Sequence, residues 1–108
     1  MYGWKNMERI KVAIIESTVI HLGKELDLKN ELEYYIKKPY KIIKEFENVY
    51  FIYSEVQDKT LKKNKIITNE NIYGTVIAVA KQGEYISLSK EQLVKLDELF
   101  IKLVVNHN

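Results

Sequence analysis

The 108-residue chain contains no cysteine, which excludes a disulfide framework and thiolate chemistry. Its four glycines are isolated from one another, so no glycine-rich loop that could cradle a phosphate group is present. Arg9 is the sole arginine, which weakens any role that needs the arginine fork to recognise phosphate or carboxylate. Membrane-length apolar runs and a secretory signal are also missing, so we expect a cytoplasmic protein with no membrane contact.

The residues that are present have the composition of an ordinary soluble domain. Apolar residues make up 46% of the chain and charged residues 30%, and the net charge of +2 is too small to argue for nucleic acid. We expect a single domain over residues 9–104, between a polar lead-in at 1–8 and a frayed end at 105–108. Either Met1 or Met7 could be the natural start.

The first third of the chain predicts two strands and a helix. Alternating hydrophobicity over residues 9–16 indicates a strand, and residues 18–22 indicate a short second strand ahead of a turn at Gly23. Asp27 is a suitable N-cap for a helix over residues 28–37, where apolar residues recur at helical spacing.

The middle of the chain predicts a hairpin. Pro39 ends the preceding helix, because proline disfavours helical geometry in the residue before it. Two alternating runs follow, namely Tyr40, Ile42, Lys44 and Phe46, and then Val49, Phe51 and Tyr53. The Glu47-Asn48 pair between them is short enough for a tight turn, so these strands should be antiparallel neighbours.

The last third predicts a loop, a strand and a helix. Residues 55–71 are mostly polar and indicate a long loop, with a brief strand at 66–67. The β-branched run at 72–80 indicates a buried strand, residues 81–84 a turn, and residues 89–92 a capping box that begins a helix. The expected apolar face of this helix comprises Leu93, Leu96, Leu99, Phe100, Leu103 and Val104.

Together these elements predict a compact α+β domain, with a largely antiparallel sheet of four or five strands and two helices packed on it. Gly74 interrupts the last strand, which indicates a bulge or a close approach of another group. Packing against a helix is the simplest explanation for this glycine, and a ligand is the alternative.

Three segments carry a family resemblance: Leu61-Lys62-Lys63-Asn64-Lys65, Ile72-Tyr73-Gly74-Thr75 and Ser87-Leu88-Ser89-Lys90-Glu91-Gln92-Leu93. With them the chain resembles a family of small domains of unknown function in phages, plasmids and integrated elements. The pattern of that family has an L-P-P-N-R-like loop, an I-x-G-T strand and an S-L-S/T-x-E-Q helix start. Here Lys62-Lys63 and Lys65 replace the two prolines and the arginine. The resemblance implies a mobile-element origin and supplies no catalytic residues.

Catalytic and metal-binding patterns are not evident. His21 and His107 lie far apart, and neither belongs to a short-spaced set of metal ligands. His21 is most simply a partly buried side chain with a backbone partner. The acidic pairs lie in charge-mixed segments and the serines have no neighbouring base. We therefore expect no enzyme activity, no metal and no cofactor.

A lysine-rich loop is the first candidate contact site. It combines Lys59, Lys62, Lys63 and Lys65 with Asn64, which could donate a hydrogen bond to a phosphate or a base. Such a loop could hold an anionic partner, either a nucleic-acid backbone or a nucleotide. The alternative is a solvated loop whose lysines keep the protein soluble.

Tyrosines on the predicted hairpin are the second candidate. The chain has 8 tyrosines, more than a core this small can hide with every hydroxyl satisfied. Tyr50 and Tyr53 are expected on opposite faces of the second hairpin strand. Exposed tyrosines anchor protein interfaces or stack on bases, and the alternative is ordinary sheet packing.

Two functions stay open. The leading hypothesis is a non-enzymatic binding protein of a phage or mobile element that counters host defence. It would act in the host cytoplasm through the hairpin and the lysine loop, either blocking an immune effector protein or sequestering its nucleotide signal, and it could form a homodimer. The alternative is a nucleic-acid-binding accessory factor that uses residues 59–65 with Tyr50 or Tyr53.

Overall fold

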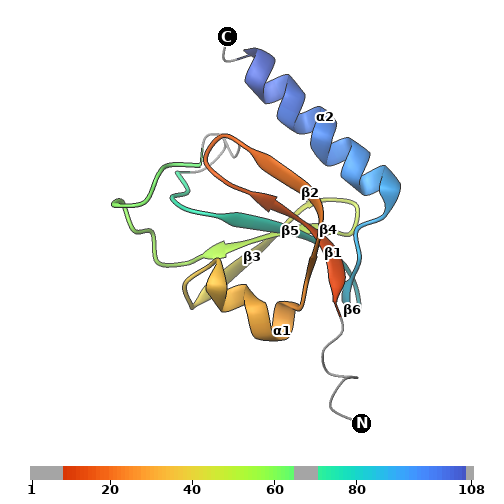
Figure 1. Ribbon diagram of the computed structural model, residues 1–108, viewed down its shortest axis with the longest axis horizontal. Coiled ribbons are helices and arrows are strands. Elements are labelled where there is room, and N and C mark those ends of the chain that lie inside the picture. The colour runs from red at the N-terminus through yellow and green to blue at the C-terminus, as the bar shows by residue number, and fades with distance from the viewer. Residues whose placement is uncertain (1–8, 65–70, 107–108) are drawn as a thin grey trace.

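The computed structural model describes residues 9–64 and 71–106, with the side chains of the last helix as far as Leu99. The elements are β1 (Ile10–Ile15), β2 (Ile20–Leu26), α1 (Leu28–Glu31), the 3-10 helix η2 (Leu32–Tyr34), β3 (Tyr40–Phe46), β4 (Val49–Ser54), β5 (Val76–Gln82), β6 (Glu84–Ile86) and α2 (Lys90–Asn106) (Figure 1). The predicted α+β class is confirmed: the described part of the chain forms a six-stranded antiparallel sheet with two α-helices.

Strand β5 occupies the centre of the sheet. The strand order is β2-β1-β5-β4-β3, and the short β6 also pairs with β5. Residues Val76 to Ala80 are all buried, which explains their unbroken apolar sequence. A strand with apolar residues on both faces must be covered on both faces, and this requirement places the remaining elements.

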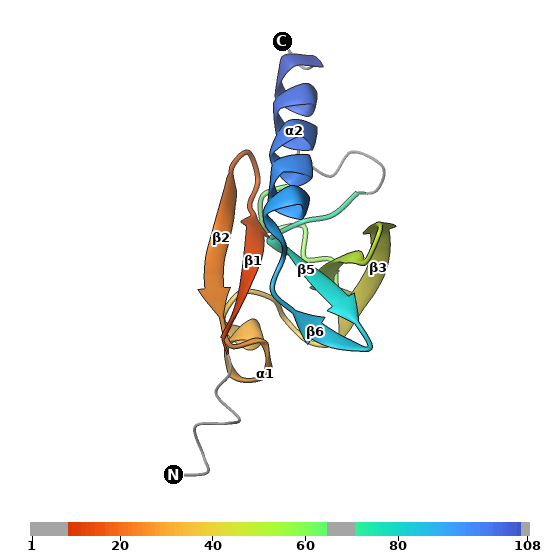
Figure 2. The same ribbon diagram turned by 90° about the vertical axis from the view of Figure 1, so that its right-hand side faces the viewer.

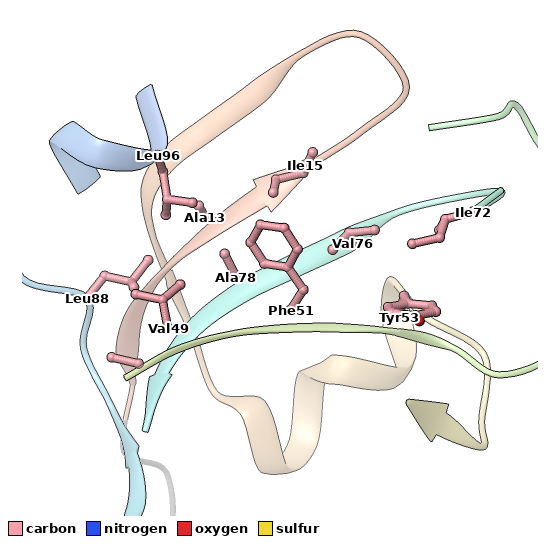
Figure 3. Close-up of a cluster of buried hydrophobic side chains, with 11 residues drawn as sticks. Ala13, Ile15, Val49, Phe51, Tyr53, Ile72, Val76, Ala78, Leu88 and Leu96 are labelled. Atoms are coloured by element: carbon pink, nitrogen blue, oxygen red, sulfur yellow. The ribbon is translucent and has the colours of Figure 1, made fainter. Parts of the chain in front are cut away.

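The face covered by α2 holds the larger cluster, called here the α2-side core. Its buried members are Ala13, Ile15, Val49, Phe51, Tyr53, Ile72, Val76, Ala78, Ala80, Leu88 and Leu96. Figure 3 shows the Phe51 ring near the middle of this cluster, with Leu88 and Leu96 toward one end and Ile72 and Tyr53 toward the other. The start of α2 therefore covers one end of the face, and the segment around Ile72 covers the other.

The opposite face forms the α1-side core. Its buried members are Val12, Ile14, Leu26, Leu32, Ile36, Ile52, Ile77 and Val79. Leu32 lies in the 3-10 helix and Ile36 follows its end, and the side chains of Tyr40, Tyr50 and Tyr85 pack around the cluster. The two cores follow from the period-2 alternation of the strands, as Phe51 and Ile52 illustrate.

The β3–β4 hairpin has the predicted turn. Phe46 pairs with Val49, which leaves Glu47 and Asn48 as a two-residue loop. Asn48 has a positive φ of 58°, a conformation that asparagine tolerates better than most residues.

A bulge near this turn changes the face of one aromatic residue. Tyr50 pairs with Lys44 and Val49 pairs with Phe46, so Glu45 is an extra residue in β3. Alternation alone placed Phe46 on the face of Tyr40, but the bulge turns it to the α2-side core. This part of the prediction was therefore wrong.

A second bulge replaces the turn expected at Gly23. Val12 pairs with Lys24 and Ala13 with Leu22, so Gly23 is the extra residue, with a φ of +73°. Strand β2 continues through it and is longer than predicted. Glycine suits this position because the positive φ is costly for other residues.

The helix after β2 starts as predicted but is shorter. The Asn30 amide donates to Asp27 Oδ1 at 3.3 Å, and Glu31 Oε1 accepts from the Asp27 amide at 2.9 Å. The α-helix ends at Glu31 and continues as a 3-10 turn to Tyr34, short of the expected ten residues. The cap was thus predictable, and the length was not.

The strand predicted over 72–80 is displaced along the chain. It begins at Val76, because Gly74 has a φ of +93°, and it runs on to Gln82 through residues expected to turn. The chain turns at Gly83, whose φ is +80°, and forms the unpredicted strand β6.

The capping box of α2 is confirmed. The Ser89 amide donates to Gln92 Oε1 at 2.7 Å, and the Gln92 amide donates to Ser89 Oγ at 3.1 Å. The first turns of α2 lie against the sheet, and the helix then projects beyond it (Figure 2). It continues to Asn106, and the last part of the end predicted to fray, residues 107–108, lies outside the described residues. The predicted lead-in at 1–8 and the brief strand at 66–67 lie outside the described residues.

Candidate functional site

The lysine-rich loop is anchored by a residue that was predicted to contact a partner. Asn64 is fully buried, and its side-chain amide donates to the Ile15 carbonyl at 3.0 Å and to the Gly74 carbonyl at 3.2 Å. Its own backbone amide donates to the Ile72 carbonyl at 2.7 Å. Asn64 therefore cannot offer its side chain to a partner at the surface, and the prediction is corrected: it joins the loop to β1 and to the start of β5.

Gly74 belongs to the same anchor. Its amide donates to the Lys62 carbonyl at 2.9 Å, and a Cβ atom added to it would lie 3.1 Å from Leu61 Cδ1. The close neighbour is thus the loop itself, and the expected helix or ligand is not what approaches this glycine. Leu61, Asn64 and Gly74, which carry part of the family resemblance, have structural roles here.

The described lysines of this loop are exposed to solvent. The side chains of Lys59, Lys62 and Lys63 are exposed, and Lys65 lies outside the described residues. The Lys63 carbonyl accepts a hydrogen bond of 3.0 Å from Ser17 Oγ, so its backbone is held beside the β1–β2 turn. Hydrogen bonds thus hold the backbone of the loop in place while its lysine side chains are exposed to solvent.

The Asn64 anchor can be tested by stability. Asn64→Ala leaves buried carbonyls without their donor, so we expect the unfolding free energy to fall by roughly 2–3 kcal/mol. Asn71→Ala is the matched control, because Asn71 is exposed, and its effect should stay within about 0.5 kcal/mol. Urea unfolding measures both, and equal small effects would contradict the anchoring role.

The two predicted tyrosines lie in different environments. Tyr53 is 3% exposed in the α2-side core, so it cannot anchor a partner directly, and this prediction is corrected. Tyr50 is half-buried on the other face, near the hairpin turn. Figure 1 shows the lysine loop at the opposite end of the sheet from that turn. The structure therefore does not bring Tyr50 and the loop into one surface.

Strand β3 forms an open edge of the sheet. It pairs with β4 on one side and with no other strand in the described part of the chain. Ile42 is 43% exposed on the α1-side face of this strand. An unpaired strand edge with exposed apolar side chains is a template for adding another strand.

A groove opens beside the same strand on the α2-side face. It has a volume of about 350 Å³ and is lined by Glu45, Phe46, Lys95, Glu98 and Leu99. The Lys95 ammonium lies 5.7 Å from the centre of the Phe46 ring, a cation–π contact across the groove. The groove therefore joins the bulged end of β3 to α2, two segments that lie far apart in the sequence.

The hairpin turn is tied to α2 next to this groove. Gln92 Nε2 donates to the Glu47 carbonyl at 3.5 Å, a long hydrogen bond. A smaller hollow of about 140 Å³ continues around the turn between Asn48 and Ser89. Gln92, a residue of the capping box, thus holds the hairpin turn against the start of α2 at one end of the groove.

Glu45 is the titratable group that this groove perturbs. Partial burial raises the pKa of its carboxyl above the ordinary glutamate range. A raised pKa means that the contribution of Glu45 to stability is fully present at low pH and is lost as the pH rises through that pKa. This shift was not predictable from the residues, because the paired acids Glu45 and Glu47 suggested an ordinary solvated segment.

Replacing this carboxyl tests its desolvation. Glu45→Gln should be more stable than the native chain at neutral pH, by less than about 0.5 kcal/mol because the group stays partly solvated. The difference should disappear near pH 3, where a carboxyl is protonated. Chemical unfolding at several pH values measures it, and a variant less stable than the native chain at neutral pH would contradict the assignment.

Among the described residues, His21 and Glu16 form a further polar contact. His21 Nε2 lies 3.0 Å from Glu16 Oε1, so its partner is a carboxylate and the expected backbone partner was wrong. Across residues 9–64 and 71–106, no three or more His, Asp or Glu side chains come together in a way that could hold a metal ion.

No helix in the described part of the chain combines the length and the apolar content that a membrane crossing requires. Comparison of the chain with protein-family models, curated proteins and solved structures finds no match.

Proposed function

We propose that this chain is a non-enzymatic binding protein that contacts another protein through β3 and the groove beside it. The family resemblance supports an origin in a phage or mobile element. In that setting the protein would counter host defence by binding an immune effector in the host cytoplasm.

The open edge of β3 is the observation that carries this proposal. Strand β3, one of the two strands that end the main order, presents an unpaired side among the described residues, with the 43%-exposed Ile42 on one face and the groove lined by Phe46 and Leu99 on the other. A partner strand added here would gain backbone hydrogen bonds from the edge and apolar contacts on both faces. Such a contact needs no catalytic group and no cofactor.

The charges in the groove favour a protein over a nucleotide signal. Glu45 and Glu98 stand beside a single cation, Lys95, which already lies over Phe46. A nucleotide carries phosphate groups, which two carboxylates repel, and no arginine is available here to hold them. Of the two anti-defence routes, blocking an effector protein is the one that this surface supports.

Nucleic-acid binding through the lysine loop is the second candidate. It is supported by the exposed Lys59, Lys62 and Lys63 on a backbone that Asn64 holds in place. It loses support from the tyrosines, because Tyr53 is buried and Tyr50 lies at the other end of the sheet, so base stacking beside these cations is not available.

A matched pair of variants tests the protein-binding proposal. Ile42→Lys places a charge on the β3 face, whereas Val19→Lys places the same charge on a similarly exposed residue of the β1–β2 turn. Quantitative affinity capture from host lysate should recover a stoichiometric protein with the native chain and with Val19→Lys. Ile42→Lys should reduce its recovery by about tenfold, because one buried aliphatic contact is lost and a charge is desolvated.

Two outcomes contradict the proposal. One is that no stoichiometric protein is recovered with the native chain. The other is that both variants lose the partner equally. Binding of single or double strands at low salt that weakens steeply as salt rises would favour the lysine loop instead.

A further inference from the structure

We propose that β3 is also the seam of a symmetric homodimer, in which it pairs antiparallel with β3 of a second copy, centred on Ile43. The inference rests on the proposed function in so far as it uses the same open edge. It goes further by naming a partner, a second copy of this chain, and the register of its binding.

The sequence of β3 is complementary to itself in this register. With Ile43 opposite Ile43 of the second copy, Lys41 stands opposite Glu45 and Ile42 stands opposite Lys44. Two-fold symmetry gives each of these pairs twice. Directly opposite residues have Cβ atoms about 4.5–5.5 Å apart, so each lysine reaches the opposing carboxylate.

The structure places the members of each charged pair on one face. Lys41 Nζ lies 6.0 Å from the centre of the Tyr53 ring on the α2 side, Ile43 packs on the α2-side core, and Glu45 lines the groove below α2. Alternation thus leaves Lys41, Ile43 and Glu45 on a common face, and the bulge adds Phe46 to that face. Lys41 of the second copy would bring a counter-charge to a carboxylate that is otherwise partly desolvated.

The other face of the seam covers an exposed aliphatic residue. Ile42 lies opposite Lys44 of the second copy and diagonally across from the second Ile42, within reach of both. Lysine can lay its methylene stem on apolar surface while its ammonium stays in water. Pairing therefore removes Ile42 from solvent in both copies without burying a charge.

Neighbouring registers lack this complementarity. A shift of the register by two residues keeps the same faces of the two copies together. In one direction it places Lys44 opposite Lys44 of the second copy, which is repulsive, and in the other it places Lys41 opposite Ile43, so that Lys41 and Glu45 lose their opposing charges. Edge lysines and a bulge normally prevent indiscriminate strand pairing, and here they leave one self-pairing favoured.

The seam is short, so the dimer should be in equilibrium with the monomer. A strand of 7 residues cannot by itself bury the roughly 1,600 Å² of a standard stable interface. The association should therefore depend on concentration and be sensitive to the two charged pairs.

Charge reversal tests the register directly. Sedimentation equilibrium should show that Lys41→Glu and Glu45→Lys each weaken dimerisation by about tenfold or more, because each variant opposes like charges twice. The double variant Lys41→Glu with Glu45→Lys should dimerise within about threefold of the native chain. An equimolar mixture of the two single variants should form a heterodimer more tightly than either associates with itself.

This design separates contacts between copies from effects inside one copy. Residues 41 and 45 are about 13 Å apart along the strand, so reversing both restores nothing within a single chain. Circular dichroism checks that each variant is folded. A native chain that stays monomeric at millimolar concentration, or a double variant as weak as the singles, would overturn the homodimer.

The outcomes also distinguish this inference from the proposed function. If the chain is monomeric while Ile42→Lys still loses a captured host protein, the homodimer fails and the binding proposal stands. If the charge reversals behave as expected while no host protein is recovered, the homodimer stands and the binding proposal fails.

Discussion

The burial of β5 on both faces is the constraint on which the rest of this molecule depends. Residues Val76 to Ala80 lie between β1 and β4 and have no polar face to turn to solvent. One face is closed by the start of α2 and the Ile72 segment, and the other by the segment of the 3-10 helix and the bend after it, which carry Leu32 and Ile36. These segments bury the apolar residues at the centre of the sheet, but they leave apolar residues of the edge strand β3 half exposed. The surface assigned to function is thus what remains once the central strand is covered.

Local signals in the sequence predicted the fold where the relevant contacts are local. Asp27 and Ser89 cap the helices as their spacing indicated, and Glu47-Asn48 forms the expected two-residue turn. Two of the failures have one physical cause: a bulge inserts a residue into an alternating pattern without changing the hydrophobicity around it. Gly23 and Glu45 are such insertions, and they reset which side chains face each core.

The candidate site was harder to predict than the fold because its parts are not local. Asn64 reads as an exposed polar loop residue, but its amide is committed to carbonyls of Ile15 and Gly74 from distant segments. The groove pairs Phe46 with Leu99, and nothing in the sequence relates these two residues. One signal was available: Lys41 and Glu45 carry opposite charges at equal distances from Ile43, a pattern that becomes informative once the strand is known to be an edge.

Hydrogen exchange measured residue by residue, free and in complex, tests most directly whether the β3 edge is where this protein is bound. In dilute solution the amides of β5 should exchange slowly, and the outward amides of Tyr40–Phe46 should exchange fast because they lack a partner strand. On association with a second copy or a captured protein, protection should appear in β3, because the contact is made at that edge. Protection that appears in residues 59–64 while β3 stays unchanged, or a β3 as protected as β5 in the free monomer, would contradict it.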